Sequence, residues 1–400
     1  TTSDMDGKYE ITVPDENSIL VYSYIGYRTQ EIRVGNQSQI VVRLVEDIEA
    51  LDEVVVVGYG VQNKRDVTGS IAKVGGDELT SVPTSSFDAA LQGRAAGVQV
   101  TQSSGLAGSG AAIRVRGIAS ITAGGDPLIV VDGIPIMQNA GERVGGAQDN
   151  PLSSINSNDI ESIDILKDAS ATAIYGSRGA NGVVLITTKR GKEGKPQISF
   201  SQKVAFSTPN VTPDMLSTRE YLEIYDEALR NDYQFNPSGS TNPATVTTYP
   251  GGFTREQALM NNTDWEDEVT RVGVSSYTDF SISWGNKKIK TYAGISHVAE
   301  NSYMKEDHFG RTSLRLNVDY NPISILKVGA NLSYSHVDHR PVPTGWDGGY
   351  GRAISNALPY FPVYNEDGSY YIFPMSTNPI TEIYEKRRRI FTDRTMASLY

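Results

Sequence analysis

Histidine is the residue whose spacing most directly suggests chemistry in this sequence, because two neighbouring imidazoles can share a metal ion. Of the four histidines, only His336 and His339, in the run HVDH, form a suggestive pair. The residues before them alternate between apolar and polar types, which predicts a strand. A spacing of three on a strand places two side chains on opposite faces. We therefore expect no shared metal and no cofactor here.

Two further segments carry weaker chemical signals. GLAGSGAA at 105–112 has the glycine content of a phosphate loop, but no Gly-Lys-Ser/Thr follows, so we interpret it as a flexible loop. The acidic run DWEDE at 264–268 could bind a cation or supply paired carboxylates, but a solvated loop is the commoner explanation for such a run, and we interpret it so. No nucleophile elbow, zinc-protease helix or kinase signature occurs, and the absence of cysteine excludes thiol catalysis. We expect no enzymatic activity.

Aromatic and amide side chains in glycine-rich loops suggest a binding site instead. Trp346 and Tyr350 lie in PTGWDGGYG, and Gln138, Asn139 and Arg143 follow the apolar stretch PLIVVDGIPI. Aromatic faces stack on sugar rings and amides hydrogen-bond to hydroxyl groups, so these five residues are candidate contacts for a carbohydrate or peptide. The alternative is ordinary packing of loop side chains.

The overall composition limits the partners. The 400 residues carry a formal charge of −11 and an isoelectric point near 5.0, which argues against non-specific binding to nucleic acid or to an anionic membrane surface. The most apolar stretches are much shorter than the roughly 20 residues of a membrane-spanning helix. Membrane-spanning strands remain compatible, because each needs only about ten alternating residues.

Residues after Gly191 show this alternation. In RTSLRLNVDY, Leu314 and Leu316 alternate with Arg315 and Asn317, and about six such strands are predicted up to residue 400. KIKTYAGISHV fits the pattern poorly. Tight turns (GNKK, NPIS) alternate with longer connections at 207–275, 299–308 and 338–392, as in outer-membrane barrels. The longest includes a predicted helix, STREYLEIYDEALRN, with a capping box from Ser217 to Glu220. A soluble α+β domain is the alternative.

The part of the chain before Gly191 differs in texture. Residues 1–46 predict three strands, GKYEITV, ILVYSYIGYRTQEIRV and QIVVRLV, which is less than a complete sandwich. Residues of about 70–190 predict a compact, glycine-rich α/β domain, with a short helix that opens near Ser85 and buried strands at IRVRG, PLIVVDGIPI and either side of the Ala-rich segment DASATAIYG. We expect the sequence to be a piece of a longer protein.

Four consecutive valines connect these two regions. In LDEVVVVGYG, acidic residues run into Val54, Val55, Val56 and Val57 and then into glycine, so a β-branched strand has few local packing partners. Such a segment is an ordinary strand or a detachable strand that pairs with the sheet edge of another protein.

The segments LDEVVVVGYG, LQGRAAGVQV, IRVRG, PLIVVDGIPI and DIESIDILKDASATAIYGSRGANGVVLITTKRG, in this order, make the sequence similar to the SusC-like TonB-dependent outer-membrane transporters. The resemblance implies a mixed fold: the C-terminal part of a carboxypeptidase-regulatory-like β-sandwich extension at 1–46, a TonB box and linker at 47–60, an α/β plug domain at 61–190, and the first strands and loops of an antiparallel transmembrane β-barrel at 191–400. The family's barrels have 22 strands, so most of the barrel lies outside this sequence.

The resemblance also implies a function and partners. A TonB-binding segment, exposed on the periplasmic side when ligand binds, would consist of Leu51, Asp52, Glu53, Val54, Val55, Val56 and Val57. TonB, with its inner-membrane energising complex, would capture this strand and apply the proton-motive force to import an oligosaccharide, or less often a peptide. A SusD-like surface lipoprotein would act as a lid.

The same resemblance implies a location. The protein would lie in the outer-membrane lipid of a Gram-negative bacterium with its N-terminus in the periplasm. Uptake of an iron chelate, signal transduction and a soluble adhesion module remain alternatives.

Overall fold

The computed structural model comprises two compact units, residues 1–70 and 71–400, which we describe separately. The structure describes residues 8–23, 27, 29–37, 39–44, 54–57, 60–63, 70–81, 84, 86–102, 104–117, 125–136, 143–144, 147–148, 151–210, 214–323, 325–344, 349–374 and 376–400.

The first unit contains two short antiparallel hairpins. One pairs β1 (Ile19–Tyr22) with β2 (Gln30–Arg33), so the predicted long second strand is in fact a hairpin. The predicted first and third strands were wrong: residues 8–13 and 39–44 form no strand. They attach through side chains, since the Tyr9 hydroxyl donates to the Ile40 carbonyl at 2.9 Å. β-branched residues favour strands mainly because their side chains pack well on a sheet. A two-stranded hairpin offers little surface for such packing, so these residues do not form strands here.

The second hairpin contains the four valines. β3 (Val54–Val57) pairs antiparallel with β4 (Gly60–Asn63), so that Val55 lies opposite Gln62 and Val56 lies opposite Val61. Within the described residues, β3 has no other strand neighbour.

The second unit begins with an α/β domain, residues 71–190. Its five-stranded sheet has the order β5-β12-β13-β8-β9, in which only the β13–β8 pair is parallel. The central strands β8 (LIVV) and β13 (VVLITT) are mainly apolar because both of their faces are covered. The strands are β5 (Ile71–Gly75), β8 (Leu128–Val131), β9 (Ile134–Ile136), β12 (Ile160–Leu166) and β13 (Val183–Thr188).

Short helices and hairpins cover this sheet. The predicted helix is α3, and its N-cap is Ser86, one residue later than the predicted Ser85, which lies outside the described residues. The covering elements are α2 (Gly76–Leu79), α3 (Phe87–Ala90), β6 (Val98–Gln102), β7 (Ala111–Val115), β10 (Arg143–Val144), β11 (Ala147–Gln148), η2 (Pro151–Ser154), η3 (Ser157–Asp159), α4 (Ala169–Thr172) and η4 (Ala173–Gly179).

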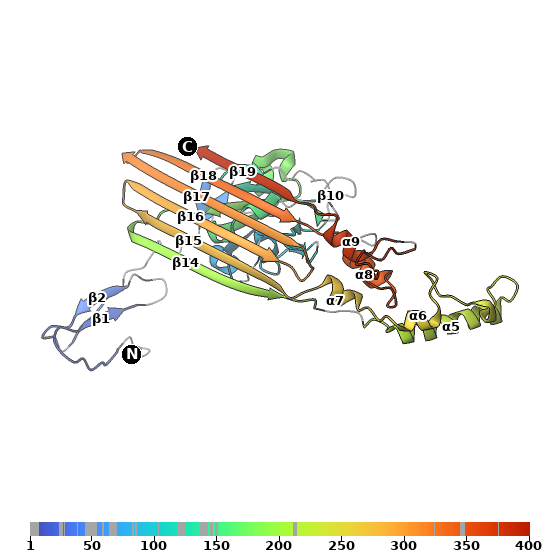
Figure 1. Ribbon diagram of the computed structural model, residues 1–400. Coiled ribbons are helices and arrows are strands. Elements are labelled where there is room, and N and C mark those ends of the chain that lie inside the picture. The colour runs from blue at the N-terminus through green and yellow to red at the C-terminus, as the bar shows by residue number, and fades with distance from the viewer. Residues whose placement is uncertain are drawn as a thin grey trace. The chain divides into compact units, whose positions relative to one another are not determined.

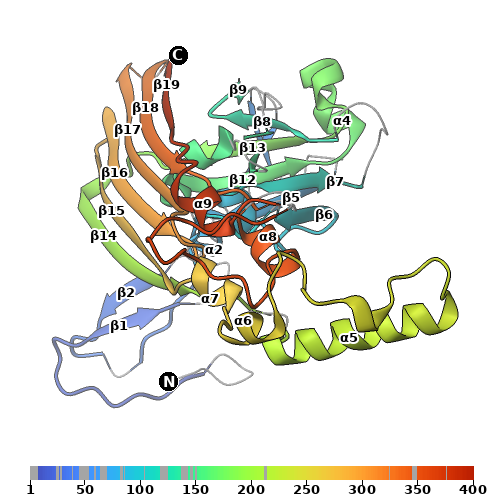
Figure 2. The ribbon, with the colours of Figure 1, turned by 45° about the vertical axis from the view of Figure 1, so that its right-hand side comes forward.

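A second sheet of six long strands follows, each antiparallel to its sequence neighbours (Figure 1). The sheet is curved, and the α/β domain lies on its concave side (Figure 2). The segment KIKTYAGISHV belongs to β16, so the poor fit noted in the sequence was misleading. The strands are β14 (Gly194–Ser207), β15 (Gly273–Gly285), β16 (Ile289–Asn301), β17 (His308–Ile323), β18 (Leu326–Arg340) and β19 (Ile390–Leu399).

The two faces of this sheet reverse the usual distribution of polarity. On β17, Leu314 and Leu316 are 47% and 42% exposed, whereas Arg315 and Asn317 are only 6% and 1% exposed. The alternation predicted from the sequence is therefore present, but its polar residues are the buried ones. The apolar face points away from the α/β domain, as expected for strands that face lipid.

One row of the outward face is polar. Six residues lie opposite one another across the strands, and they are hydrogen-bonded in adjacent pairs: Thr278 with Gln202, His297 with Thr312 at 3.0 Å, and His336 with Asp393 at 2.9 Å. His336 thus points outward while His339 is buried, which confirms that the two imidazoles lie on opposite faces.

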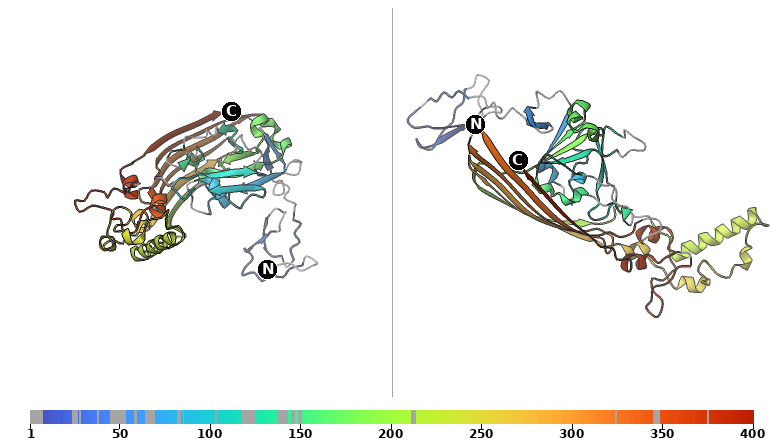
Figure 3. Two further views of the ribbon diagram at one scale, coloured as in Figure 1. Left: turned by 90° about the vertical axis from the view of Figure 1, so that its right-hand side faces the viewer. Right: turned by 90° about the horizontal axis from the view of Figure 1, so that it is seen from above.

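The long connections gather beyond one end of the sheet, which we call the loop end; the tight turns define the turn end (Figure 3). The connection at 302–307 is shorter than predicted, because β16 extends to Asn301. The predicted helix is α5, with both bonds of its capping box present. The connections contain α5 (Thr218–Phe235), η5 (Pro243–Thr245), α6 (Arg255–Leu259), α7 (Trp265–Val269), α8 (Gly349–Ser355) and α9 (Pro379–Tyr384).

These helices share a small aromatic core. Leu222 of α5, Trp265 of α7 and Ile380 of α9 pack in one buried cluster with Tyr360 and Phe361, so the two longest connections fold against each other. Among the described residues, no helix is both long and apolar enough to cross a membrane.

Candidate functional site

The structure describes only part of the segment predicted to bind TonB. Leu51, Asp52 and Glu53 lie outside the described residues. The other four predicted residues form β3, where each has a backbone partner on β4: Val54, Val55, Val56 and Val57. The extended conformation expected of these valines is present, but it is already paired within the chain. Their role in binding TonB stays a prediction.

The predicted substrate contacts are also described only in part. Gln138, Asn139 and Trp346 lie outside the described residues. The backbone of Arg143 begins β10, and Tyr350 lies in α8. The role of these five residues in binding stays a prediction.

Tyr350 is a packing residue in this structure. Its half-buried ring meets the ring of Tyr303 edge-on, with centroids 6.2 Å apart, beside the buried cluster of Leu106 and Met304. Tyr303 in turn lies over Gly105, where an added β-carbon would be 3.2 Å from its ring. A residue of the long connection at 341–389 thereby reaches the α/β domain through one intervening ring.

The 104–109 loop of the α/β domain is fastened to the sheet. The N–H of Ala107 donates to Asp307 at 2.7 Å, and the N–H of Gly108 donates to Glu300 at 2.8 Å. The interpretation of GLAGSGAA as a flexible loop was therefore wrong. Its glycines permit close approach rather than motion: Gly108 has φ +68°, and a β-carbon there would lie 2.1 Å from the Phe309 ring.

Arg315 of β17 is the centre of a second group of contacts. Its guanidinium lies 3.4 Å from a carboxylate oxygen of Asp132 and 3.6 Å from one of Asp159, and all three side chains are buried. Asp132 also accepts bonds from the backbone and hydroxyl of Thr188. Burial raises the pKa of Asp159, and the nearby Arg315 opposes this effect.

Further polar residues extend the same interface along β16 and β17. Arg311 donates to the carbonyls of Ser153 and Ile155 at 2.7 and 3.0 Å, and the Tyr292 hydroxyl donates to Asp159 at 2.8 Å. Asn317 donates to the Lys189 carbonyl at 2.7 Å. β-strand side chains thus hold the α/β domain through hydrogen bonds and ion pairs, and Ala107 adds an apolar contact with Phe309.

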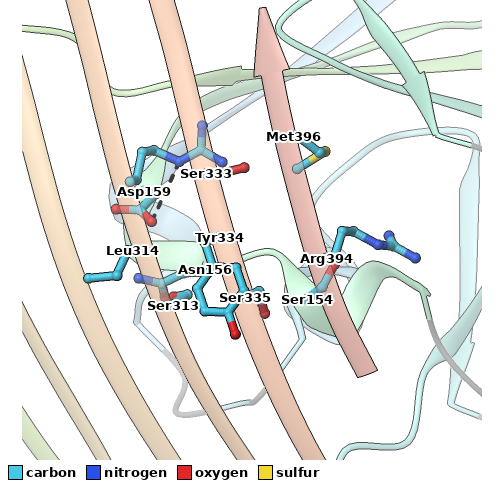
Figure 4. Close-up of a pocket in the computed structure, with 11 residues that line it drawn as sticks. Ser154, Asn156, Asp159, Ser313, Leu314, Ser333, Tyr334, Ser335, Arg394 and Met396 are labelled. Carbon is cyan, nitrogen blue, oxygen red and sulfur yellow. Dashed lines mark ion pairs between the residues drawn. The ribbon is translucent and has the colours of Figure 1, made fainter. Parts of the chain in front are cut away.

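Small polar clefts remain between these contacts. One lies between Ser154, Asn156 and Asp159 of the α/β domain and Ser333 and Ser335 of β18, with Arg394 and Met396 of β19 at its side (Figure 4). It has room for about one water molecule, not for a sugar ring or a peptide. The interface is therefore a contact surface between two parts of the chain rather than a substrate pocket.

Sequence reasoning missed these residues. Arg311, Arg315 and Asn317 belong to the polar face that the alternation identified, but their partners lie more than 120 residues earlier in the chain. Among the described residues, no group of three or more acidic or histidine side chains could hold a metal ion.

Comparison with known proteins identifies this arrangement. The TonB-dependent Receptor Plug Domain family matches residues 63–183, and the CarboxypepD_reg-like domain family matches residues 1–56. TonB-dependent receptor P26 of Formosa agariphila is 39% identical over 409 aligned positions, which cover 100% of this chain and 38% of that protein. TonB-dependent receptor SusC of Bacteroides thetaiotaomicron is 37% identical over 375 positions, 92% of this chain and 34% of that protein.

The chain belongs to the SusC-like TonB-dependent receptors.

Its α/β domain is the plug of this family, and the six long strands are part of a transmembrane β-barrel. A solved structure agrees: the RagAB peptide importer in its open-open state aligns with a TM-score of 0.66 at 26% sequence identity, over 87% of this chain and 40% of that chain. The chain spans between 33% and 38% of the length of the curated relatives. The resemblance stated from the motifs and the predicted fold class are thereby confirmed.

Proposed function

We propose that this chain is part of an importer in the outer membrane of a Gram-negative bacterium. The importer takes up oligosaccharides, and the proton-motive force drives this uptake through TonB. The observation that carries the proposal is the plug seated on the concave face of the barrel sheet through buried polar contacts. A plug in this position blocks the barrel, so import requires that these contacts open and close again.

The chemistry of the interface supports reversible opening. When a buried ion pair such as Arg315 with Asp132 separates, water replaces the lost partners, so the net cost is smaller than the interaction itself. An apolar interface of similar size would expose apolar surface to water when it opens, so its opening would cost more free energy. The plug can therefore shift or locally rearrange while its own core stays packed.

For energy coupling we propose residues 51–57 as the TonB-binding segment, within a linker that spans 47–60 between the extension at 1–46 and the plug at 61–190. β3 pairs with β4 along one edge, so a partner strand has two routes: it adds to the other edge, or it replaces β4. Because successive N–H groups along a strand point to opposite edges, each route uses alternate N–H groups among Val54–Val57.

For cargo binding we propose that Gln138, Asn139, Arg143, Trp346 and Tyr350 contact the cargo, and that a SusD-like surface lipoprotein covers the loop end. The contact of Tyr350 with Tyr303 supports a role for α8 in reporting cargo to the plug. The N-terminus then lies in the periplasm. The barrel part of the chain, residues 191–400, turns its turn end toward the same compartment.

The substitution Val55→Pro tests the coupling step, because proline removes a ladder donor without changing the plug. We expect uptake of labelled oligosaccharide by whole cells to be lost while binding at the cell surface is retained. Val55→Ala keeps the N–H and should transport normally. In calorimetry, a peptide of residues 46–60 should bind the periplasmic domain of TonB, and its Val55→Pro form should not. Normal uptake by Val55→Pro cells would refute the proposal.

Peptide import by the same mechanism is the second candidate, favoured by the similarity to the RagAB peptide importer. The two cargoes are separated by competition: an unlabelled peptide mixture should not reduce oligosaccharide uptake if the first proposal holds. Uptake of labelled peptides that oligosaccharides do not inhibit would select the second.

A further inference from the structure

The outward face of the barrel sheet becomes cationic at the loop end. The longest uninterrupted run of basic residues in the sequence, Lys386–Arg389, leads into β19 there, and β18 ends at Arg340. Arg340 lies opposite His308 of β17, which lies opposite Asn301 of β16. His308 alternates with the buried Phe309, so this row of polar side chains belongs to the outward face.

The acids near this row are already paired, whereas Arg340 is not. Asp338 accepts two hydrogen bonds from Arg389, at 2.6 and 2.7 Å, and Asp393 is bonded to His336 at 2.9 Å. Within the described part of the chain, Arg340 forms no ion pair. The net charge of −11 gives the molecule as a whole no attraction for anions, so any attraction here is local to this row.

Two contacts fix the neighbouring side chains. The Arg389 guanidinium lies over the Phe391 ring, 4.6 Å from its centroid. The amide of Asn301 donates to the Val274 carbonyl, so its oxygen accepts from Nδ1 of His308 at 2.9 Å. Nε2 of a neutral His308 is then an acceptor. This part of the sheet therefore presents guanidinium donors beside a hydrogen-bond acceptor.

The row lies at the depth of lipid headgroups. The exposed Tyr320 and Trp284 near the turn end mark one edge of the apolar band, as aromatic girdles do in outer-membrane barrels. His308 is about 40 Å from Tyr320 along β17, at about 3.3 Å per residue. A strand tilted by about 40° rises roughly 30 Å over that length, whereas the apolar band is about 25 Å tall. His308 and Arg340 therefore lie just beyond the hydrocarbon.

We propose that Arg340, Arg389 and His308 bind the phosphorylated headgroup of a glycolipid in the surrounding leaflet.

Each part of the site matches one part of such a lipid. The two guanidinium groups donate to phosphate oxygens, whose geometry suits them. Nε2 of His308 accepts from a sugar hydroxyl, and the exposed Phe391 and Leu314 lie along the acyl chains. A free phosphate ion uses only the arginines. That the leaflet is the outer one rests on the proposed function, which puts the loop end outside the cell.

Titration of lipid A into the detergent-purified full-length protein tests the site, with native mass spectrometry as the measure of bound lipid. Lipid A carries phosphates on a diglucosamine headgroup. Arg340→Gln should raise the Kd roughly tenfold, because charge-assisted hydrogen bonds are lost while no ion pair within the protein is broken. Lys287→Gln removes the same charge in the exposed turn between β15 and β16 and should bind lipid A like the wild type.

Two further arms separate the lipid from a free anion. Dephosphorylated lipid A, with the same acyl chains, should bind the wild type at least about tenfold more weakly than lipid A. Equimolar inorganic phosphate should not displace lipid A.

Equal affinity of the wild type and Arg340→Gln, or equal binding of the two lipids, would overturn the site. Displacement by equimolar phosphate would overturn it too, because the ligand would then be a free anion. None of these measurements requires TonB or uptake, so failure of the import proposal and failure of the lipid site are distinguishable.

Discussion

The core of the plug and the interface between the plug and the barrel sheet are held by different kinds of contact: apolar packing in the core, and ion pairs and hydrogen bonds at the interface. In the core, Ile129, Ile163 and Val184 are fully buried among apolar neighbours. At the interface, Arg311, Arg315 and Asn317 are equally buried but among polar groups. Apolar packing loses its whole contribution when water enters, whereas ion pairs and hydrogen bonds exchange their partners for water. The difference marks the plug as a body that stays folded while its attachment changes.

The largest expected effect breaks the polar side of this comparison. Arg315→Met leaves Asp132 and Asp159 buried without their cation, which should destabilise the docked plug by about 3–5 kcal/mol. The triple variant Arg315→Met, Asp132→Asn, Asp159→Asn should recover most of that loss, because none of these three groups then carries a buried charge. Hydrogen exchange of residues 153–159 in the full-length protein measures both. Equal loss in the single and triple variants would show that shape, not charge, holds the interface.

A core substitution tests the apolar side. Ile163→Ala removes a fully buried side chain from β12 and should reduce the opening free energy of β12 and β13 amides by about 2–5 kcal/mol. Ile174→Ala, at a position 52% exposed in η4, serves as the matched control and should change it by less than about 0.5 kcal/mol. If Ile163→Ala reduced the opening free energy of residues 153–159 more than that of β12, the core and the interface would not be independent as we describe.

A buried acid inside the plug provides a smaller, pH-dependent effect. Burial raises the pKa of Asp88, which accepts a bond from the Ala111 N–H at 2.7 Å. The folded plug therefore favours the protonated carboxyl. This contribution to stability is complete below the unfolded pKa near 4 and is lost as the pH rises through the raised value. Exchange of β7 amides should accelerate over that window, after intrinsic correction, and Asp88→Asn should remove the dependence. Acceleration toward acid instead would reverse our assignment.

The smallest effect is expected at the edge of the interface. Lys192 and Glu161 are 3.4 Å apart but 67% and 44% exposed, so Lys192→Ala should cost at most about 1 kcal/mol. Its effect on exchange near Glu161 should vanish at high salt. A loss comparable to that of Arg315→Met would mean that burial does not distinguish the two ion pairs.

The sequence predicted the fold more completely than the contacts. Alternation around Leu314 and Leu316 identified the strands, because the period of two depends only on which face is apolar. It could not show that Arg315 faces a folded domain rather than water, since Asp132 is 183 residues away. The 105–112 segment was misjudged for the same reason: glycine content suggests freedom, but the carboxylates that fasten it come from β16 (Glu300) and from the connection that follows it (Asp307). The helix at 218–235 was predictable because its cap is local.

The polar row on the outward face has a consequence for how the barrel assembles. Each outward side chain in that row, from Gln202 to Asp393, finds its hydrogen-bond partner on a neighbouring strand. A single strand that entered the hydrocarbon layer alone would carry an unsatisfied polar group, at a cost of several kcal/mol. Pairing of β14 with β15, β16 with β17, and β18 with β19 satisfies these groups within the sheet, so we expect each pair to form before its polar residues meet lipid.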